Sequence, residues 1–276
     1  MPFTISHAVA VLPISKYFAK YTAFSALIIG SMTPDFAYLT PFLVDQRVDS
    51  HSLLGIYLFC IPMGLTVYFI YHFFMAPVIV SILPKKLQQH LNKDLFIGKI
   101  PDIPSFTLIS SLVIGSFTHI FWDFFTHQSG IPQYINWMDA PLSTVDGFDI
   151  MPYRLLQHFS SVFGLSLLIF LIWEWYKRKE LSNHSSIPNS ESSHWKASKT
   201  LKIITRFTLL IIPISIGIIS GLINLPKSDV LYGIYGAQVF VRNAIVGSAG
   251  GLILACIILG IFYQINIYRT TKRRLV

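Results

Sequence analysis

Residues 106–127 read FTLISSLVIGSFTHIFWDFFTH and form an apolar run long enough to cross a membrane as one helix, which takes about 20 residues. His119, Asp123 and His127 recur in this run at intervals of four. On a helix these positions share one stripe, which drifts by about 40° per step. Phenylalanine and isoleucine cover the remaining surface. A polar stripe on an apolar helix needs polar partners from elsewhere in the chain.

The composition of the whole chain is that of a polytopic membrane protein. It has 276 residues, of which 53% are hydrophobic and 12% charged, and its mean hydropathy is +0.58. A soluble domain carries about 25% charged residues. We therefore predict an all-α helical bundle with five full spans and an N-terminal re-entrant hairpin built from 7–14 and 22–33. The predicted spans are 52–83, 106–127, 159–176, 203–223 and 243–264.

Charge is distributed unevenly among the connections between these spans. Lysine and arginine crowd residues 84–104, 177–202 and the C-terminal tail, whereas 34–51, 128–157 and 224–242 hold most of the acidic residues. The positive-inside rule places the first three segments and the C-terminus in the cytoplasm. It also accounts for the net charge of +8 without a nucleic-acid partner. The expected partner is the lipid bilayer, and the oligomeric state stays open.

A polar segment divides the predicted bundle into parts. Residues 177–198 are rich in Ser, Asn and His and favour a polar cytoplasmic linker. We expect a membrane-embedded metal-site domain over 1–176 and a C-terminal transmembrane helical pair over 199–276. The two cysteines, Cys60 and Cys256, lie inside predicted spans and are expected to be buried free thiols.

The predicted topology brings further ionisable residues to the outer side of the membrane. Ionisable groups at membrane depth usually mark a functional site, and imidazole and carboxylate are ligands of zinc and similar divalent metals. His119 and Asp123 are close enough on a helix to share one ion. His127 lies about 12 Å along the axis from His119 and favours a second ion, bridged by Asp123. The predicted metal ligands are His7, Asp35, His51, His119, Asp123, His127 and His158.

Other readings exist for individual residues of this kind. A single membrane histidine is more often a packing residue than a ligand, which is how we interpret His72. His90, His184 and His194 fall in cytoplasmic segments and are expected to be solvated. The outer acidic loop is expected to be solvated as well, although it could supply a late ligand or a general base from Asp139, Asp146 or Asp149.

Several blocks of the sequence resemble a known bacterial family. PFTISHAVAVLP, GSMTPDF, HSLLG, GSFTHIFWDFFTH and LLQHFSSVFG occur in the order typical of domain of unknown function 4184, and they cover most of residues 1–176. The blocks also resemble, more distantly, those of the YdjM-type inner-membrane metal-dependent hydrolases. Membership of this group implies that the protein lies in the bacterial cytoplasmic membrane.

A more remote resemblance concerns the zinc-dependent bacterial phospholipases C, which are all-helical phosphodiesterases with three zinc ions. The order of His and Asp residues is similar, which implies metal-ligand roles for the seven residues named above and one to three zinc ions. Those enzymes have a Glu ligand four residues after the last His. Here Val162 stands at that position, so the third ion lacks this ligand.

Together these observations predict a divalent-metal-dependent hydrolase whose site opens near the outer interface. The metal would activate a water, and Asp35 or Asp123 would bridge ions or orient that water. The location favours an ester or phosphoester of a lipid or lipid-linked substrate. Two alternatives stay open: a transporter or metal-ion carrier, and a non-catalytic membrane protein with a structural metal site, which would be closed by protein ligands.

Overall fold

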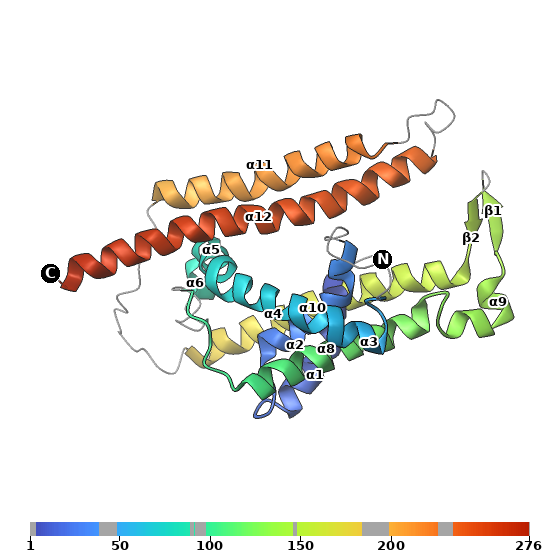
Figure 1. Ribbon diagram of the computed structural model, residues 1–276, viewed down its shortest axis with the longest axis horizontal. Helices are drawn as coiled ribbons and strands as arrows, with labels where there is room; N and C mark the ends of the chain where they lie inside the picture. The colour runs from blue at the N-terminus through green and yellow to red at the C-terminus, as the bar shows by residue number, and fades with distance from the viewer. Residues whose placement is uncertain are drawn as a thin grey trace. The chain divides into compact units, whose positions relative to one another are not determined.

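The computed structural model describes residues 4–38, 49–88, 91, 98–145, 148–183, 199–225 and 234–275. Most of them are helical (Figure 1), which confirms the predicted all-α class. Five helical stretches are long and apolar enough to cross a membrane and confirm the five predicted spans; they indicate an integral membrane protein. These are Leu53–Ile82, Ser105–Tyr134, Pro152–Lys179, Thr200–Ile223 and Gly236–Arg269.

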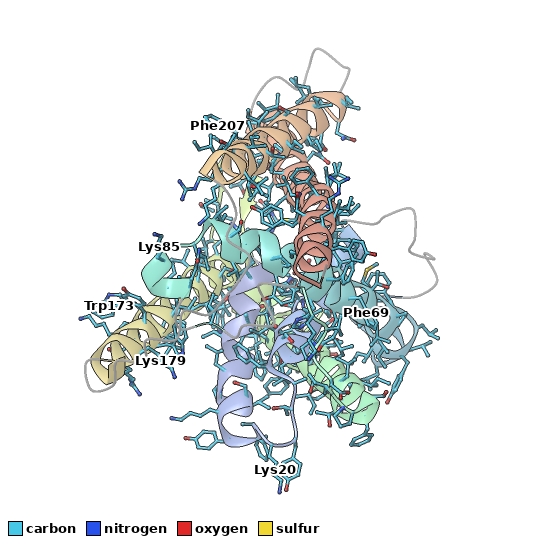
Figure 2. All side chains as sticks on the ribbon, turned by 90° about the vertical axis from the view of Figure 1, so that its left-hand side faces the viewer. Lys20, Phe69, Lys85, Trp173, Lys179 and Phe207 are labelled. Carbon is cyan, nitrogen blue, oxygen red and sulfur yellow. The ribbon has the colours of Figure 1, made fainter. Side chains whose placement is uncertain are left out.

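The first part of the chain forms the predicted helical hairpin. The 3-10 helix η1 (Thr4–His7) leads into α1 (Ala8–Tyr17), and α2 (Phe24–Gly30) returns to η2 (Thr33–Tyr38). Lys20 lies in the turn between the two helices (Figure 2). Whether the hairpin enters the membrane stays a prediction.

The later elements follow the predicted order. The first span joins α3 (Leu53–Gly55), η3 (Ile56–Cys60), α4 (Ile61–Ile70), η4 (Tyr71–Met75) and α5 (Ala76–Ile82), and it precedes α6 (Lys85–Gln88). The remaining helices are α8 (Ser105–Thr126), η5 (Ile131–Tyr134), α9 (Asn136–Asp139), α10 (Pro152–Asn183), α11 (Lys199–Ile223) and α12 (Ile234–Leu275). A short antiparallel pair, β1 (Ser143–Val145) and β2 (Phe148–Ile150), was not predicted; Thr144 faces Asp149 in it.

The chain forms two compact units. Unit 1 comprises Met1–Tyr68 and Ile103–Ile187, and unit 2 comprises Phe69–Asp102 and Pro188–Val276. Helix α10 continues through the first seven residues of the predicted linker, 177–183, and the rest of that linker lies outside the described residues. Trp173 and Lys179 mark this end of α10 in Figure 2, and Lys177 lies 3.7 Å from the Trp173 ring centroid, as in an interfacial anchor.

Helix α8 of unit 1 carries polar side chains on its buried face and apolar side chains on its exposed face. The buried residues of α8 include Ser111, Gly115, Ser116, His119, Asp123 and Thr126. Phe117, Phe121, Phe124 and Phe125 on the same helix are exposed. Water would penalise such a surface, whereas lipid would not, because hydrocarbon tails are as apolar as the side chains that face them.

Two glycines allow α2 and α8 to touch along their backbones. A Cβ at Gly30 would lie 2.4 Å from the Leu112 carbonyl oxygen, and one at Gly115 would lie 2.4 Å from the Leu27 carbonyl oxygen. Hydrogen bonds run along the same seam: the Ser116 hydroxyl donates to the Gly30 carbonyl at 3.1 Å, and the Ala23 N–H donates to Ser111 Oγ at 2.9 Å. This contact fixes α8 against the end of α2.

Unit 2 holds helices α11 and α12 side by side (Figure 1). Small residues make this packing possible, since a Cβ on Gly217 would collide with Ser248, and one on Gly247 would lie 2.5 Å from Ser220 Cβ. A buried hydroxyl chain joins α12 to its neighbours: Tyr263 donates to Ser81 at 2.8 Å, and Thr205 lies 3.1 Å from the Tyr263 oxygen.

Candidate metal centre

His119 is the most constrained residue of the site. Its side chain is fully buried on α8, and its Nδ1 donates to the Ser31 carbonyl, at the end of α2, over 2.8 Å. The close approach of α2 and α8 is therefore what orients this imidazole. With its proton on Nδ1, a neutral His119 directs the Nε2 lone pair away from α2. In metal sites, a carbonyl that accepts from the other ring N–H orients the binding histidine in the same way.

Asp35 approaches from the hairpin and is also buried. It lies in η2, directly after Pro34, and its Oδ2 accepts a 2.7 Å hydrogen bond from the Thr4 hydroxyl of η1. That bond leaves Oδ1 facing the two imidazoles of His51 and His119. One oxygen is thus held by the protein and the other is presented to the site.

His51 lies just before the first span. Ser52 caps the following helix by accepting the Gly55 N–H at 2.9 Å, and the His51 backbone N–H donates to Asp49 Oδ1 at 2.9 Å. The His51 Nδ1 lies 3.1 Å from Ser50 Oγ. These local contacts turn the ring so that Nε2 points to Asp35 Oδ1, 3.2 Å away.

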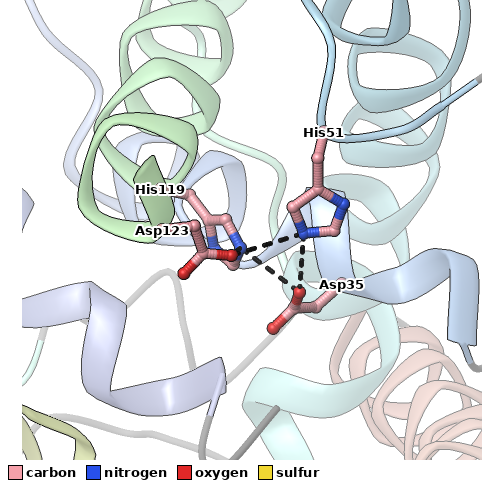
Figure 3. Close-up of side chains that lie close together, drawn as sticks. All are labelled: Asp35, His51, His119 and Asp123. Atoms are coloured by element: carbon pink, nitrogen blue, oxygen red, sulfur yellow. Dashed lines mark hydrogen bonds and ion pairs between the residues drawn. The ribbon is translucent and has the colours of Figure 1, made fainter. Parts of the chain in front are cut away.

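Four side chains form a ring in which imidazole nitrogens and carboxylate oxygens alternate. We call it the His/Asp ring (Asp35, His51, His119 and Asp123; Figure 3). Asp35 Oδ1 lies 3.2 Å from both His51 Nε2 and His119 Nε2. Asp123 Oδ2 lies 3.2 Å from His119 Nε2 and 3.5 Å from His51 Nε2. One donor atom from each residue lies within 4.8 Å of the other three.

The second oxygen of Asp123 faces two further histidines. Its Oδ1 lies 3.6 Å from His7 Nε2 and 3.4 Å from His127 Nδ1. The His7 ring stacks on His119 with centroids 3.9 Å apart, and Trp122 meets its edge at 6.2 Å. Asp123 thus stands between the His/Asp ring and a second imidazole pair; its bridging of two ions stays a prediction.

Several polar atoms of this site are buried without a hydrogen-bond partner within the described parts of the chain. They are His119 Nε2, His7 Nδ1 and both carboxylate oxygens of Asp123. Buried polar atoms nearly always have a hydrogen-bond partner, and an exception is explained by a bound water or ion or by a catalytic role. Three of these four atoms belong to residues of the His/Asp ring.

Burial also sets the charge states of the groups from the hairpin. Burial, reinforced by the neighbouring His119, lowers the pKa of His7 to about 4, so this imidazole is neutral at pH 7. Burial disfavours a charged Asp35, but the imidazoles of His119 and His51 outweigh that effect and lower the Asp35 pKa below its ordinary value. Neutral imidazole and ionised carboxylate are the forms that bind metals.

A pocket opens beside Asp123 and connects the site to solvent. Its empty space is about 260 Å³, including its open mouth. It is lined by Thr4, His7, Asp35, Trp122, Asp123, Thr126, His127, Gln157, Ser160 and Ser161. Elements η1, α8 and α10 therefore all contribute to one small cavity with a mostly polar wall.

The structure brings six of the seven predicted ligands together. His158 is not among them: it is exposed on α10, while Gln157, Ser160 and Ser161 line the pocket. The reason is helical geometry, because neighbouring positions on a helix point about 100° apart. Thr4, Trp122 and the α10 residues were not predicted, although the spacing of Gln157, Ser160 and Ser161 at i, i+3 and i+4 marks one helix face.

The remaining polar candidates have ordinary roles where the structure describes them. Asp139 Oδ1 accepts from Gln128 at 2.9 Å, and Asp149 Oδ1 accepts from Thr144 at 2.7 Å. His72 is buried beside Tyr71 in η4, with ring centroids 4.9 Å apart, consistent with packing. Asp146, His90, His184 and His194 lie outside the described residues.

Comparison with known proteins gives a family but no characterised relative. The model of a family described as a domain of unknown function, DUF4184, matches residues 1–261. No curated protein and no solved structure matches the chain. The resemblance to YdjM-type hydrolases and to zinc-dependent phospholipases C therefore stays a prediction.

Proposed function

Because the chain belongs to the DUF4184 family, whose description assigns no activity, we propose a function from the site itself. We propose a membrane-embedded, divalent-metal-dependent hydrolase that cleaves an ester or phosphoester of a lipid or lipid-linked substrate. The observation that carries this proposal is the His/Asp ring, in which the buried His119 Nε2 lies 3.2 Å from oxygens of two different carboxylates.

The donor atoms of this ring are close enough together for a single divalent ion. The four nitrogen–oxygen distances measure 3.2, 3.2, 3.2 and 3.5 Å, near the roughly 3.3–3.6 Å between ligands of a tetrahedral zinc, and all four donors lie within 4.8 Å of one another. Two imidazoles and two carboxylates suit zinc and similar metals. The free oxygen of Asp123, with His7 and His127, offers donors for a second ion.

The chemistry follows from the pocket next to these donors. A divalent ion held by the ring would supply Lewis acidity and would lower the pKa of a bound water toward about 7. Asp123 Oδ1 faces the pocket without a hydrogen-bond partner in the described structure and is placed to accept the proton of an attacking water. The neutral His7 beside it can relay that proton.

A structural metal site is the competing proposal, because structural sites are filled by protein ligands and the ring offers four protein donors. Two observations favour catalysis over it. The pocket reaches the site from solvent, and Asp123 keeps one oxygen that the ring does not use. The transporter alternative stays a prediction as well.

Metal content tests the centre directly. Purified wild-type protein should hold about one or more divalent ions per chain by elemental mass spectrometry, and His119→Gln combined with Asp123→Asn should lose them. Asp149→Asn, on the exposed hairpin, is the matched control and should keep them. Unchanged metal content in the double variant, with an unchanged elution volume, would refute the centre.

Turnover separates the two metal proposals. Wild-type protein should hydrolyse at least one member of a panel of phosphate mono- and diesters and short-chain lipid esters, and a chelator should abolish that activity. Metal that raises the unfolding temperature without supporting turnover on any member would favour the structural site instead.

A further inference from the structure

We propose that Gln157, Ser160 and Ser161, which we call the α10 wall, form a subsite for an uncharged, hydroxyl-bearing part of the substrate, such as the glycerol or sugar of a head group. This proposal rests on the proposed hydrolase function and names its substrate class. The α10 wall faces Thr4, His7 and the metal centre across the same pocket.

Ser161 provides the central observation. Its residue is only 5% exposed, yet it lines the pocket, and its hydroxyl makes no hydrogen bond to any residue that the structure describes. Its oxygen is not sealed from the pocket that it lines. A ligand hydroxyl in the pocket could donate a hydrogen bond to it or accept one from it.

The neighbouring members of the α10 wall extend the same surface. Ser160 donates to the Gln157 carbonyl at 3.0 Å, which leaves the Ser160 oxygen free to accept a hydrogen bond. The Gln157 side chain offers an amide N–H donor and a carbonyl acceptor. Paired donors and acceptors match vicinal hydroxyl groups, which both donate and accept.

The charge of the pocket argues against a second anionic group on this side. No lysine or arginine is among the described residues that line it. The negative charge of a phosphoryl group would therefore be neutralised at the metal centre. The α10 wall would select the substrate through hydrogen bonds between uncharged groups. An ester of a polyol fits both the metal centre and the α10 wall.

The size of the pocket limits what enters it. Its space of about 260 Å³ includes the open mouth, so the enclosed part is small. The head group would therefore occupy the mouth of the pocket, and an acyl chain must stay outside. Phe159 and Phe163, stacked at 6.4 Å and exposed on α10 next to the α10 wall, provide an apolar surface for such a chain.

The test compares two phosphate monoesters on metal-loaded wild-type protein in detergent. Glycerol 3-phosphate should bind about tenfold more tightly than methyl phosphate by calorimetry, which is the gain expected from one or two added hydrogen bonds. In Gln157→Leu combined with Ser161→Ala, the affinity for glycerol 3-phosphate should fall to that for methyl phosphate. The affinity for methyl phosphate should change by less than about twofold, since the metal centre is intact.

Ser166→Ala, on an exposed position of α10, is the matched control and should keep the preference. Short-chain phosphatidylglycerol and phosphatidylmethanol in the same micelles distinguish a lipid source from a free ester, and a preference for the glycerol compound in either pair supports the subsite. Equal affinities within both pairs, no binding of either pair, or equal weakening of both monoesters in the double variant would overturn it. Metal-dependent turnover despite such a result would leave the proposed function standing.

Discussion

Thr4 shows how one hydroxyl outside the His/Asp ring can control its geometry. It donates to Asp35 Oδ2 at 2.7 Å and so leaves a single oxygen, Oδ1, for the two imidazoles. Outer-shell partners of this kind typically change metal affinity by 10–100-fold. We predict that Thr4→Val, which keeps the side-chain shape, weakens metal binding by about that factor in competition titrations with a chromogenic chelator.

Thr4→Ser is the matched control for this prediction, because it retains the hydroxyl and should bind metal nearly as well as the wild type. An affinity of Thr4→Val equal to that of the wild type would mean that packing alone orients Asp35. Equal losses in both variants would point to the lost methyl or shape rather than to the hydrogen bond.

The contact between α2 and α8 places His119 beside the Ser31 carbonyl. Gly115→Ala would place a Cβ 2.4 Å from the Leu27 carbonyl oxygen and 2.7 Å from the Ser31 nitrogen, both backbone atoms. The helices must then separate, which shifts the Ser31 carbonyl away from His119 Nδ1. We expect a loss of about 1–3 kcal/mol in stability, together with weaker metal binding, in thermal unfolding of the detergent-solubilised protein.

Gly250→Ala on α12 is the control for helix propensity, since nothing lies within 4 Å of a Cβ at that position. Alanine is the better helix former by about 1 kcal/mol, so this variant should be neutral or more stable. If Gly115→Ala behaved in the same way, the backbone contact would not position the site.

The whole chain should sit in the membrane with its metal centre toward the outer face. Helix α10 joins the β1–β2 region to the basic segment after Trp173, so its two ends report opposite sides. Ser143→Cys should react with an impermeant maleimide from outside, and Lys179→Cys only after the membrane is opened. The native Cys60 and Cys256 are buried and should stay silent. The reverse labelling pattern would place the centre on the cytoplasmic side.

Local patterns in the amino-acid sequence were enough to predict the five spans, the N-terminal helical hairpin and the proximity of six polar side chains. Hydropathy depends on residues that are neighbours in the chain, and a helix converts a spacing of four into one face whatever surrounds it. The stripe of His119, Asp123 and His127 could therefore be predicted directly from the sequence. The convergence of His7, Asp35 and His51 followed from counting how often the chain crosses the membrane.

Only the tertiary structure decided which atoms meet. Hydropathy does not encode the rotation of a helix about its axis, so it favoured His158, whereas packing turns Gln157, Ser160 and Ser161 into the pocket. Likewise, the bond from Thr4 to Asp35 joins residues 31 positions apart. It depends on how η1 packs rather than on any local pattern. Distances of a few tenths of an ångström separate a metal cage from a set of scattered polar residues, and packing alone sets them.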